Sequence, residues 1–146
     1  MSNEEHNKDR CKSIATEIEA YNESRMYRCP ECGAMIEWDD DCYDMEEGTY
    51  TCPECETTFD EDELQALSIH DYLAKNAYDV EYRIDAQGNY KSVEIMVAGG
   101  GPNIYIDTAD NRVKLFWWLE KAEYSFLSDV GNAIDKYYEQ EYENMR

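Results

Sequence analysis

Apolar residues recur at steps of three and four near each end of the chain, which is the spacing of an amphipathic α-helix. The first such stretch runs from Asp9 to Arg25 and predicts a helix whose other face is acidic. The polar residues 1–9 before it are expected to fray. The second stretch begins at Ser128, a plausible capping residue, and continues to the C-terminus. Its apolar stripe consists of Val130, Ile134, Tyr137, Tyr138, Tyr142 and Met145.

A third helix is expected between Asp60 and Ala77. Asp60 can cap a helix, and Glu63 stands three residues later, as in a capping box. Acidic side chains also suit the positive end of a helix dipole. His70 lies in this segment without a second His nearby, so a structural or exposed role is expected for it. The apolar positions of this helix would be Leu64, Leu67 and Leu73.

From Tyr78 onward, apolar and polar residues alternate, which is the period of a half-buried β-strand. Short turns at residues 86–89, 99–103 and 108–111 separate four such runs. Sequential strands joined by short turns form an antiparallel meander. The face expected in the core carries Val80, Tyr82, Ile84, Val93, Ile95, Val97, Ile104, Ile106, Val113, Leu115 and Trp117.

The opposite face of this predicted sheet is not simply polar. It carries four large apolar residues among charged ones, namely Met96, Tyr105, Phe116 and Trp118. Either another part of the chain covers this face, which is the more common arrangement, or the face binds a partner.

Four of the six cysteines form two identical CPEC tetrapeptides, which are separated by nineteen residues. Four thiolates complete a tetrahedral Zn²⁺ shell with Zn–S distances of about 2.3 Å. The spacing lies at the upper end of the range for zinc sites. Four thiolates also hold iron, so the sequence leaves that choice of metal open. The predicted ligands of a structural Zn²⁺ ion are Cys29, Cys32, Cys52 and Cys55.

Two further cysteines lie outside the CPEC pairs. Cys11 is on the apolar stripe of the first helix and is expected to pack there. Cys42 lies midway between the pairs, and because two pairs already satisfy zinc, it is expected to be a bystander rather than a substitute ligand or a redox thiol.

The CPEC pairs resemble those of the zinc ribbon family, in which two knuckles on hairpin turns hold one structural ion. The resemblance covers about residues 26–60 and implies strands on either side of each knuckle. The sequence thus suggests an N-terminal amphipathic helix in residues 1–25, a ribbon in residues 26–60, and a helix, sheet and C-terminal helix in residues 61–146. The predicted fold class is α+β, with an N-terminal helix, a four-cysteine zinc ribbon and a four-stranded antiparallel meander packed by helices.

The chain is strongly acidic, with 34 Asp and Glu against 13 Lys and Arg and a formal net charge of −21. Residues 29–74 hold fifteen acidic residues and no Lys or Arg. Direct binding of nucleic acid is therefore not expected, because such binding depends on cations that neutralise phosphates. A basic protein surface is the expected partner. The candidate partner-binding residues are Glu37, Asp39, Asp40, Asp41, Asp44, Glu46, Glu47, Glu54, Glu56, Asp60, Glu61, Asp62 and Glu63.

Catalytic signatures are missing from the sequence. There are two His, no nucleophile motif and no H-E-x-x-H motif, and a four-thiolate zinc ion has no open position for water. The Gly99–Gly101 run leads into another strand and lacks the helix that phosphate-binding loops need. A non-enzyme is therefore predicted. Since no segment can span a membrane and the N-terminus is not a signal peptide, a cytoplasmic location without a membrane partner is expected.

In size, charge and lack of catalytic motifs, the chain resembles the small acidic inhibitors of phages and mobile elements, of the anti-CRISPR and anti-restriction type. This resemblance implies an inhibitor that mimics DNA or RNA and occupies the basic nucleic-acid-binding surface of a host defence nuclease, in the cytoplasm of the host cell. The alternative is a zinc-ribbon adaptor that bridges subunits of a transcription, replication or other macromolecular complex. The acidic stretch could also provide only solubility. A third and less favoured hypothesis is an enzyme that binds Mg²⁺ through Asp39, Asp40 and Asp41, since neighbouring residues of an extended loop rarely converge on one octahedral ion.

Overall fold

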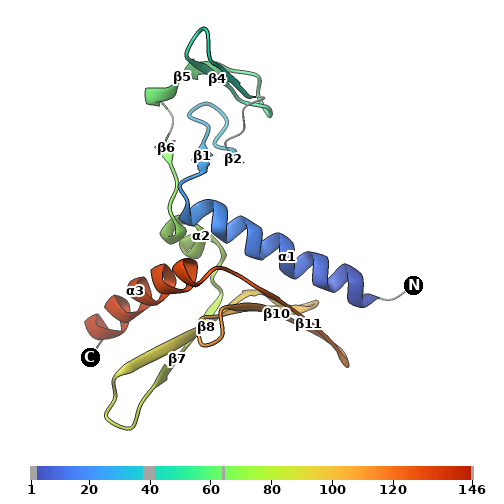
Figure 1. The fold of residues 1–146 in the computed structure, drawn as a ribbon, viewed down its shortest axis with the longest axis vertical. Coiled ribbons are helices and arrows are strands. Elements are labelled where there is room, and N and C mark those ends of the chain that lie inside the picture. Colours follow the sequence, from blue (N-terminus) through green and yellow to red (C-terminus); the bar gives the residue numbers. More distant parts are fainter. Residues whose placement is uncertain (1–2, 38–41, 64, 146) are drawn as a thin grey trace. The chain divides into compact units, whose positions relative to one another are not determined.

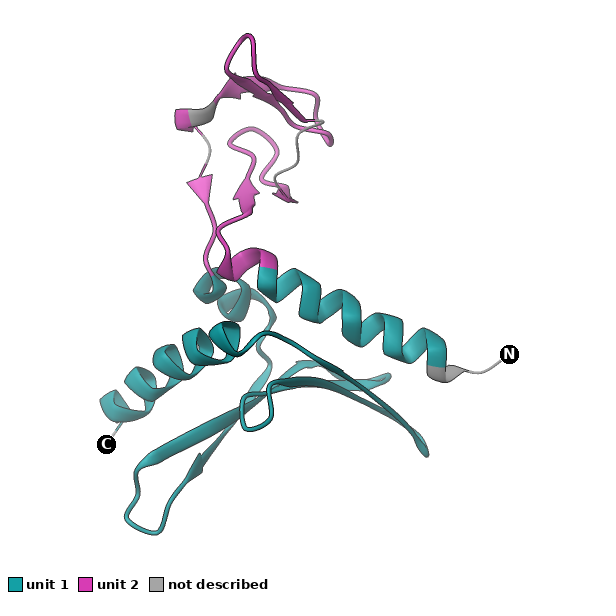
Figure 2. Ribbon diagram, in the orientation of Figure 1, with its two compact units in different colours: residues 1–19, 69–146 teal, residues 20–68 magenta. Residues whose placement is uncertain are grey.

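The computed structural model describes residues 3–37, 42–63 and 65–145, and its chain divides into two compact units. Unit 1 comprises residues 1–19 and 69–146, and unit 2 comprises residues 20–68 (Figure 2). Unit 1 therefore joins segments from both ends of the chain, while unit 2 contains the whole expected ribbon segment.

The first helix, α1 (Asn3–Asn22), begins earlier than the predicted Asp9. The expectation that residues 1–9 fray was wrong from Asn3 onward. Asn7 is buried, and its side-chain amide donates a hydrogen bond from Nδ2 to Oε2 of Glu120 at 3.4 Å. Cys11 is also fully buried, as predicted, and burial raises the pKa of its thiol to about 11.

The C-terminus of α1 is set by Ser24, whose φ of 61° ends the helical backbone. The N–H of Ser24 donates to the carbonyl oxygen of Tyr21 at 3.2 Å, and the N–H of Arg25 donates to that of Ala20 at 2.9 Å. These two bonds form a Schellman motif. The helix therefore ends before the predicted Arg25.

The sheet of unit 1 is an antiparallel meander, as predicted, but its described residues form five strands instead of four. The strands are β7 (Asp79–Ile84), β8 (Tyr90–Ala98), β9 (Asn103–Asp107), β10 (Arg112–Trp117) and β11 (Glu120–Ser125). They lie in the order β11-β10-β9-β8-β7. β11 was not predicted, because Glu120, Ala122 and Tyr124 stand where the other strands carry mostly large aliphatic residues.

Three helices, α1, α2 (Ile69–Asn76) and α3 (Ser128–Met145), lie on one face of this sheet (Figure 1). The predicted C-terminal helix is confirmed by α3. Six of the predicted core residues on the three inner strands are fully buried, namely Val93, Ile95, Ile104, Ile106, Val113 and Leu115. These side chains and those of the helices form the core of unit 1.

The predicted core face was partly wrong at the ends and edges of the sheet. Ile84 is 49% exposed, because the pairing of β7 with β8 shifts by one residue between Arg83 and Ile84. Such a bulge interrupts the alternation on an edge strand. Four further members of the predicted face are only half-buried, namely Val80, Tyr82, Val97 and Trp117.

A polar network holds α3 to the sheet. The carboxylate of Asp135 accepts hydrogen bonds from the hydroxyl groups of Tyr90 and Thr108, at 2.6 and 2.7 Å. The Thr108 hydroxyl also lies 3.0 Å from the backbone nitrogen of Val93, which donates to it. Because burial and the neighbouring carboxylate of Asp135 disfavour the charged form, the pKa of Tyr90 is raised well above its usual range.

Unit 2 contains two small antiparallel sheets. One has the order β2-β1-β6, with β1 (Met26–Arg28), β2 (Met35–Glu37) and β6 (Gln65–Ala66). The other has the order β3-β4-β5, with β3 (Tyr43–Asp44), β4 (Thr49–Thr51) and β5 (Thr58–Asp60). The predicted strands around Ile36 and Tyr50 are thus present as β2 and β4, although Trp38 lies outside the described residues.

The helix expected between Asp60 and Ala77 was wrong over its first half. Residues Glu61–Glu63 form a short 3-10 helix, η2, and β6 then pairs with β1, with Ala66 opposite Tyr27. The α-helix α2 begins only at Ile69. The capping signals at Asp60 were local, whereas pairing with a distant strand decided the conformation of residues 65–66.

Candidate metal centre

The four CPEC cysteines meet in unit 2. Their sulfur atoms all lie within 4.8 Å of one another, with 3.7 Å between Sγ of Cys29 and Cys55 and 3.8 Å between Sγ of Cys32 and Cys52. A tetrahedral ion with Zn–S bonds of about 2.3 Å places its sulfur ligands ~3.8 Å apart. The four predicted ligands are therefore brought together at a spacing that fits one metal ion.

Each CPEC tetrapeptide is folded as a tight turn by its own backbone. In the first knuckle, the N–H of Cys29 donates to the carbonyl oxygen of Ala34 at 2.9 Å. In the second, the N–H of Cys52 donates to that of Thr57 at 3.0 Å. These bonds return the chain towards its starting point, so that both thiols of a pair point to the same side.

Each knuckle connects two strands that pair with each other. The turn of Cys29 and Cys32 lies between β1 and β2, and the turn of Cys52 and Cys55 lies between β4 and β5. The two knuckles thus come from different small sheets of unit 2. A metal ion held by all four thiolates would join these two sheets, which is the arrangement that the ribbon resemblance implies.

Thr57 supports the second knuckle with its side chain as well. Its Oγ1 lies 3.3 Å from Sγ of Cys55. Hydrogen bonds from the Thr57 side chain and backbone lower the pKa of the Cys55 thiol to about 6. A metal ion binds the thiolate form, so these donors favour the form that ligates. Thr57 was not predicted, because its only signal in the sequence is its position two residues after the last cysteine.

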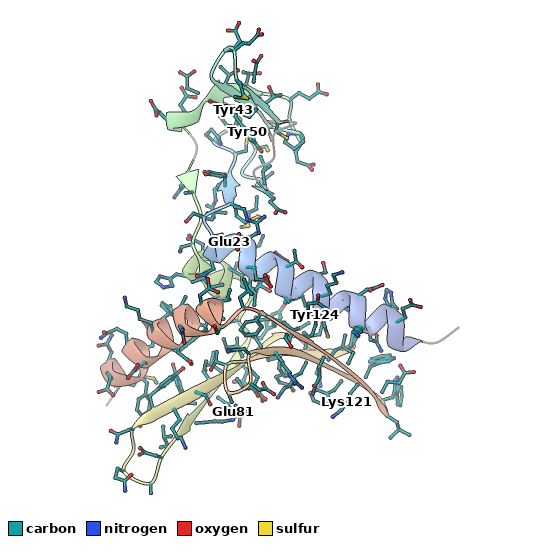
Figure 3. The ribbon with its side chains drawn as sticks, in the orientation of Figure 1. Glu23, Tyr43, Tyr50, Glu81, Lys121 and Tyr124 are labelled. Carbon is teal, nitrogen blue, oxygen red and sulfur yellow. The ribbon has the colours of Figure 1, made fainter. Side chains whose placement is uncertain are left out.

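The cysteine cluster continues into a small apolar core. Cys29 and Cys52 are buried together with Ile36, Tyr50 and Phe59. The ring centroids of Tyr50 and Phe59 are 5.8 Å apart. Figure 3 shows Tyr50 and Tyr43 side by side in this part of unit 2. The apolar residues shield one side of the cluster, whereas Cys32 is exposed on the other.

Cys42 packs against this small core but does not belong to the group of four. Within the described residues, the four CPEC cysteines are the one group of His, Cys, Asp or Glu side chains that is identified as able to hold a metal ion. Four thiolates fill a tetrahedral shell, so this donor set leaves no position for a reactive water molecule. The arrangement can hold structure together but offers no site for hydrolysis.

The acidic candidate residues that the structure describes belong to unit 2, and their side chains are exposed wherever they are described. These exposed residues are Glu37, Asp44, Glu46, Glu47, Glu54, Glu56, Asp60, Asp62 and Glu63. Asp39, Asp40 and Asp41 lie outside the described residues, as does the side chain of Glu61.

Some of these acidic side chains already have partners inside unit 2. Glu37 forms an ion pair with Arg25, which also pairs with Glu23 at 2.7 Å. Asp44 Oδ1 accepts hydrogen bonds from the N–H groups of Glu46 and Glu47, at 3.0 and 3.3 Å. Asp44 therefore shapes the turn between β3 and β4, and this turn presents Glu46 and Glu47 to solvent.

No protein-family model matches the chain, and no curated protein or solved structure matches it either. Among the helices that the structure describes, none combines the length and the apolar composition needed to cross a membrane. Function is therefore inferred from the residues and their geometry.

Proposed function

We propose that this protein is a non-enzymatic inhibitor whose acidic unit 2, held together by a structural Zn²⁺ ion, occupies the basic nucleic-acid-binding surface of another protein. The observation that carries this proposal is that all nine candidate acidic side chains that are described are exposed, in a unit that holds the metal centre and contains no lysine. The expected partner is a nuclease of a host defence system, as for the small acidic inhibitors of phages and mobile elements.

The charge of unit 2 supports a cationic partner. Residues 20–68 contain fifteen acidic residues against Arg25 and Arg28, and Arg25 is already paired with Glu23 and Glu37. Little positive charge is left to offset the exposed carboxylates. Such a one-signed surface attracts a basic surface and speeds association with it.

Mimicry of nucleic acid requires charges at a high and fixed density. Duplex DNA carries one negative charge per roughly 1.7 Å of its axis. Short strands and tight turns hold neighbouring carboxylates at short spacings, as in the turn that carries Glu46 and Glu47. The metal ion would keep these turns in place by joining the two knuckles, so the proposed role of zinc is to fix the acidic surface.

The closed thiolate shell supports a binding function over a catalytic one. Zinc with four protein ligands has no position at which it could activate water, and unit 2 contains no His. We therefore assign the cysteines to structure and the carboxylates to binding. A cytoplasmic location, in the host cell if the gene is carried by a phage, is part of this proposal.

The proposal is tested with two matched charge-reversed variants. One replaces Glu46, Glu47 and Asp62 in unit 2 by lysine. The matched control replaces three exposed acidic residues of unit 1 by lysine, namely Asp9, Glu139 and Glu141. Both variants change the net charge equally, and Asp44 is left intact because it shapes its turn.

The immobilised full-length protein is used to capture partners from extract of its native host, and bound proteins are eluted with rising salt or with duplex DNA. We expect a nucleic-acid-binding enzyme that elutes with salt and with DNA, that the unit 2 variant fails to capture and that the control variant retains. The captured enzyme, once purified, should lose DNA binding when the wild-type protein is added. Capture that survives the unit 2 reversal, or that DNA does not displace, would overturn mimicry.

A further inference from the structure

The turn between β10 and β11 has a sequence that tight turns rarely use. Trp117 pairs with Glu120, so Trp118 and Leu119 are the two residues of the turn. Trp118 has a φ of 55°, a conformation that glycine or asparagine usually adopts in two-residue hairpin turns. A left-handed backbone costs a residue with a side chain about 1–2 kcal/mol. The chain thus places a bulky aromatic residue where local stability favours glycine.

Both turn residues project into solvent. Trp118 is 85% exposed and Leu119 is 105% exposed. The ring of Trp118 packs edge-on against the ring of the neighbouring Trp117, with the ring centroids 5.8 Å apart. Burying a large apolar side chain is worth roughly 1.5–3 kcal/mol, and these two side chains gain little of it within the described chain. Strained backbone with exposed large side chains is typical of a contact site.

The turn continues into an apolar strip on the sheet face that the helices leave bare. We call Met96, Tyr105 and Phe116 the outer strip. Met96 lies opposite Tyr105 in the strand register, and the rings of Tyr105 and Phe116 are 5.9 Å apart. Phe116 is 42% exposed. Figure 3 shows Glu81 and Lys121 on this side of the sheet and Tyr124 on the side of α1.

Charges on this outer face are nearly balanced, unlike those of the rest of the chain. The strand alternation places five acidic and four basic residues on it, namely Asp79, Glu81, Glu94, Asp107 and Glu123 with Arg83, Arg112, Lys114 and Lys121. Most of them are already paired. Arg83 bonds Glu94 and Asp107, Lys114 bonds Asp107, and Arg112 bonds Glu123. A strongly basic partner therefore finds little attraction here.

We propose that two copies of this chain associate through their outer faces. A two-fold interface uses the same patch twice, so a patch with balanced charge avoids the repulsion that two chains of net charge −21 meet elsewhere. An axis parallel to the strands, with β9 stacked on β9, places β10 and β11 of one copy over β8 and β7 of the other. Arg112 of one copy then lies over Glu94 of the second copy, since both residues pair with Asp107 in the strand register.

The same axis gives the exposed turn a place to pack. In the strand register, the turn at Trp118 lies at the end of the sheet where β7 begins. Tyr78, which precedes β7 at that end, is 75% exposed. Each turn of the dimer would therefore lie over the Tyr78 end of the second copy, and both outer strips would be buried between the sheets. Two stacked sheets with apolar inner faces are a common stable packing.

The test is sedimentation velocity of the full-length, zinc-loaded protein over a range of concentrations, at about 0.05 M and about 0.5 M salt. We expect the mass to double with rising concentration and the association to strengthen at high salt, because screening reduces repulsion between the acidic chains. The opposite salt dependence is expected for the proposed basic partner, so the two proposals fail independently.

Trp118→Gly separates association from folding. Because glycine relieves the left-handed strain, this variant should unfold at a higher temperature than the wild type when both are compared at a concentration at which they are monomeric. Its dimer should dissociate at least about tenfold more readily than that of the wild type. Phe116→Ser should act in the same direction on association. Met145→Ser removes an apolar side chain from α3 whose exposure of 64% lies between those of Phe116 and Trp118, and it should leave the dimer unchanged.

A chain that stays monomeric at both salt concentrations would overturn the proposal, as would a dimer that Trp118→Gly and Phe116→Ser leave intact. Equal weakening by Met145→Ser would show non-specific association and would count against it as well. Co-sedimentation of the monomer with phosphatidylcholine vesicles, lost in Trp118→Gly, would assign the turn to a lipid surface instead.

Discussion

Gly33 and Glu56 occupy equivalent positions in the two knuckles, although one has no side chain and the other is acidic. Each follows the second cysteine of its tetrapeptide, and its N–H donates to the carbonyl oxygen of the first cysteine, at 3.0 Å from Gly33 to Cys29 and 2.8 Å from Glu56 to Cys52. Both have left-handed backbones, with φ of 74° and 60°. Positive φ strains a residue with a Cβ atom, so the second knuckle carries strain that the first avoids.

Glu56→Gly should therefore stabilise unit 2. We expect a gain of about 1 kcal/mol in the free energy of unfolding of the zinc-loaded protein, measured by denaturant titration. Glu56→Gln is the control, because it removes the charge and keeps the strained backbone, and it should gain much less. Equal gains in both variants would show that charge repulsion, rather than backbone strain, limits the second knuckle.

Cys52→Ser should release the metal ion. Losing one of four thiolates opens the shell, and the two small sheets of unit 2 would then lose their link. Elemental analysis should find about one zinc ion per wild-type chain and close to none in Cys52→Ser. In nuclear magnetic resonance spectra, the amide signals of unit 2 should lose their chemical-shift dispersion, while those of unit 1 keep their positions. Cys42→Ser is the matched control and should keep its zinc; loss of metal there would contradict the assignment of four ligands.

Asp107 should contribute to stability through its charge. The residue is 2% exposed, and Arg83 and Lys114 bond its carboxylate at 2.6 and 3.0 Å. Burial by itself raises its pKa, but hydrogen bonds from Arg83, the Ala109 N–H and Lys114 outweigh burial and lower that pKa to about 2. We expect Asp107→Asn to lower the free energy of unfolding by about 2 kcal/mol at neutral pH.

The pH dependence of this effect follows from the sign of the shift. Because the pKa of Asp107 is lower in the folded than in the unfolded chain, its contribution is complete above pH ~5 and is lost as the pH falls from about 4 to about 2. The difference between wild type and Asp107→Asn should shrink over that range. Asp110→Asn is the control, since Asp110 is 41% exposed and its ion pair with Lys114 should contribute under ~1 kcal/mol. A constant difference down to pH ~2 would contradict the role of the charge.

Gly131 allows α3 to approach the turn between β9 and β10. A Cβ atom at Gly131 would lie 1.9 Å from Oδ1 of Asn111. We therefore expect Gly131→Ala to destabilise the protein by about 1–3 kcal/mol in thermal unfolding, although alanine favours helices. In an Asn111→Gly background the clash disappears, and the same substitution should become neutral or stabilising. If Gly131→Ala still destabilises the protein in the Asn111→Gly background, a contact other than the one with Asn111 causes the loss of stability.

Much of the metal centre could be predicted from the sequence. Each CPEC tetrapeptide can form a short turn that directs two thiolates to one ion, so two such tetrapeptides predict four ligands. The four cysteines were named correctly as one group, and Cys42 lies outside it. The contacts of Thr57 could not be foreseen, since the return of the chain after the knuckle brings its carbonyl oxygen to the N–H of Cys52 and its hydroxyl group to Sγ of Cys55. The proposed binding role of the acidic residues stays a prediction.

By itself, the sequence determined the features that near neighbours control. The helix from Ser128, the four alternating strands and the two knuckles have local periods or spacings that the backbone must follow. The tertiary structure decided the rest: β6 replaced the predicted helix because it pairs with β1, and β11 formed because it pairs with β10. It also decided that the helices leave the outer strip bare. These outcomes depend on partners distant in the chain, which a local pattern does not record.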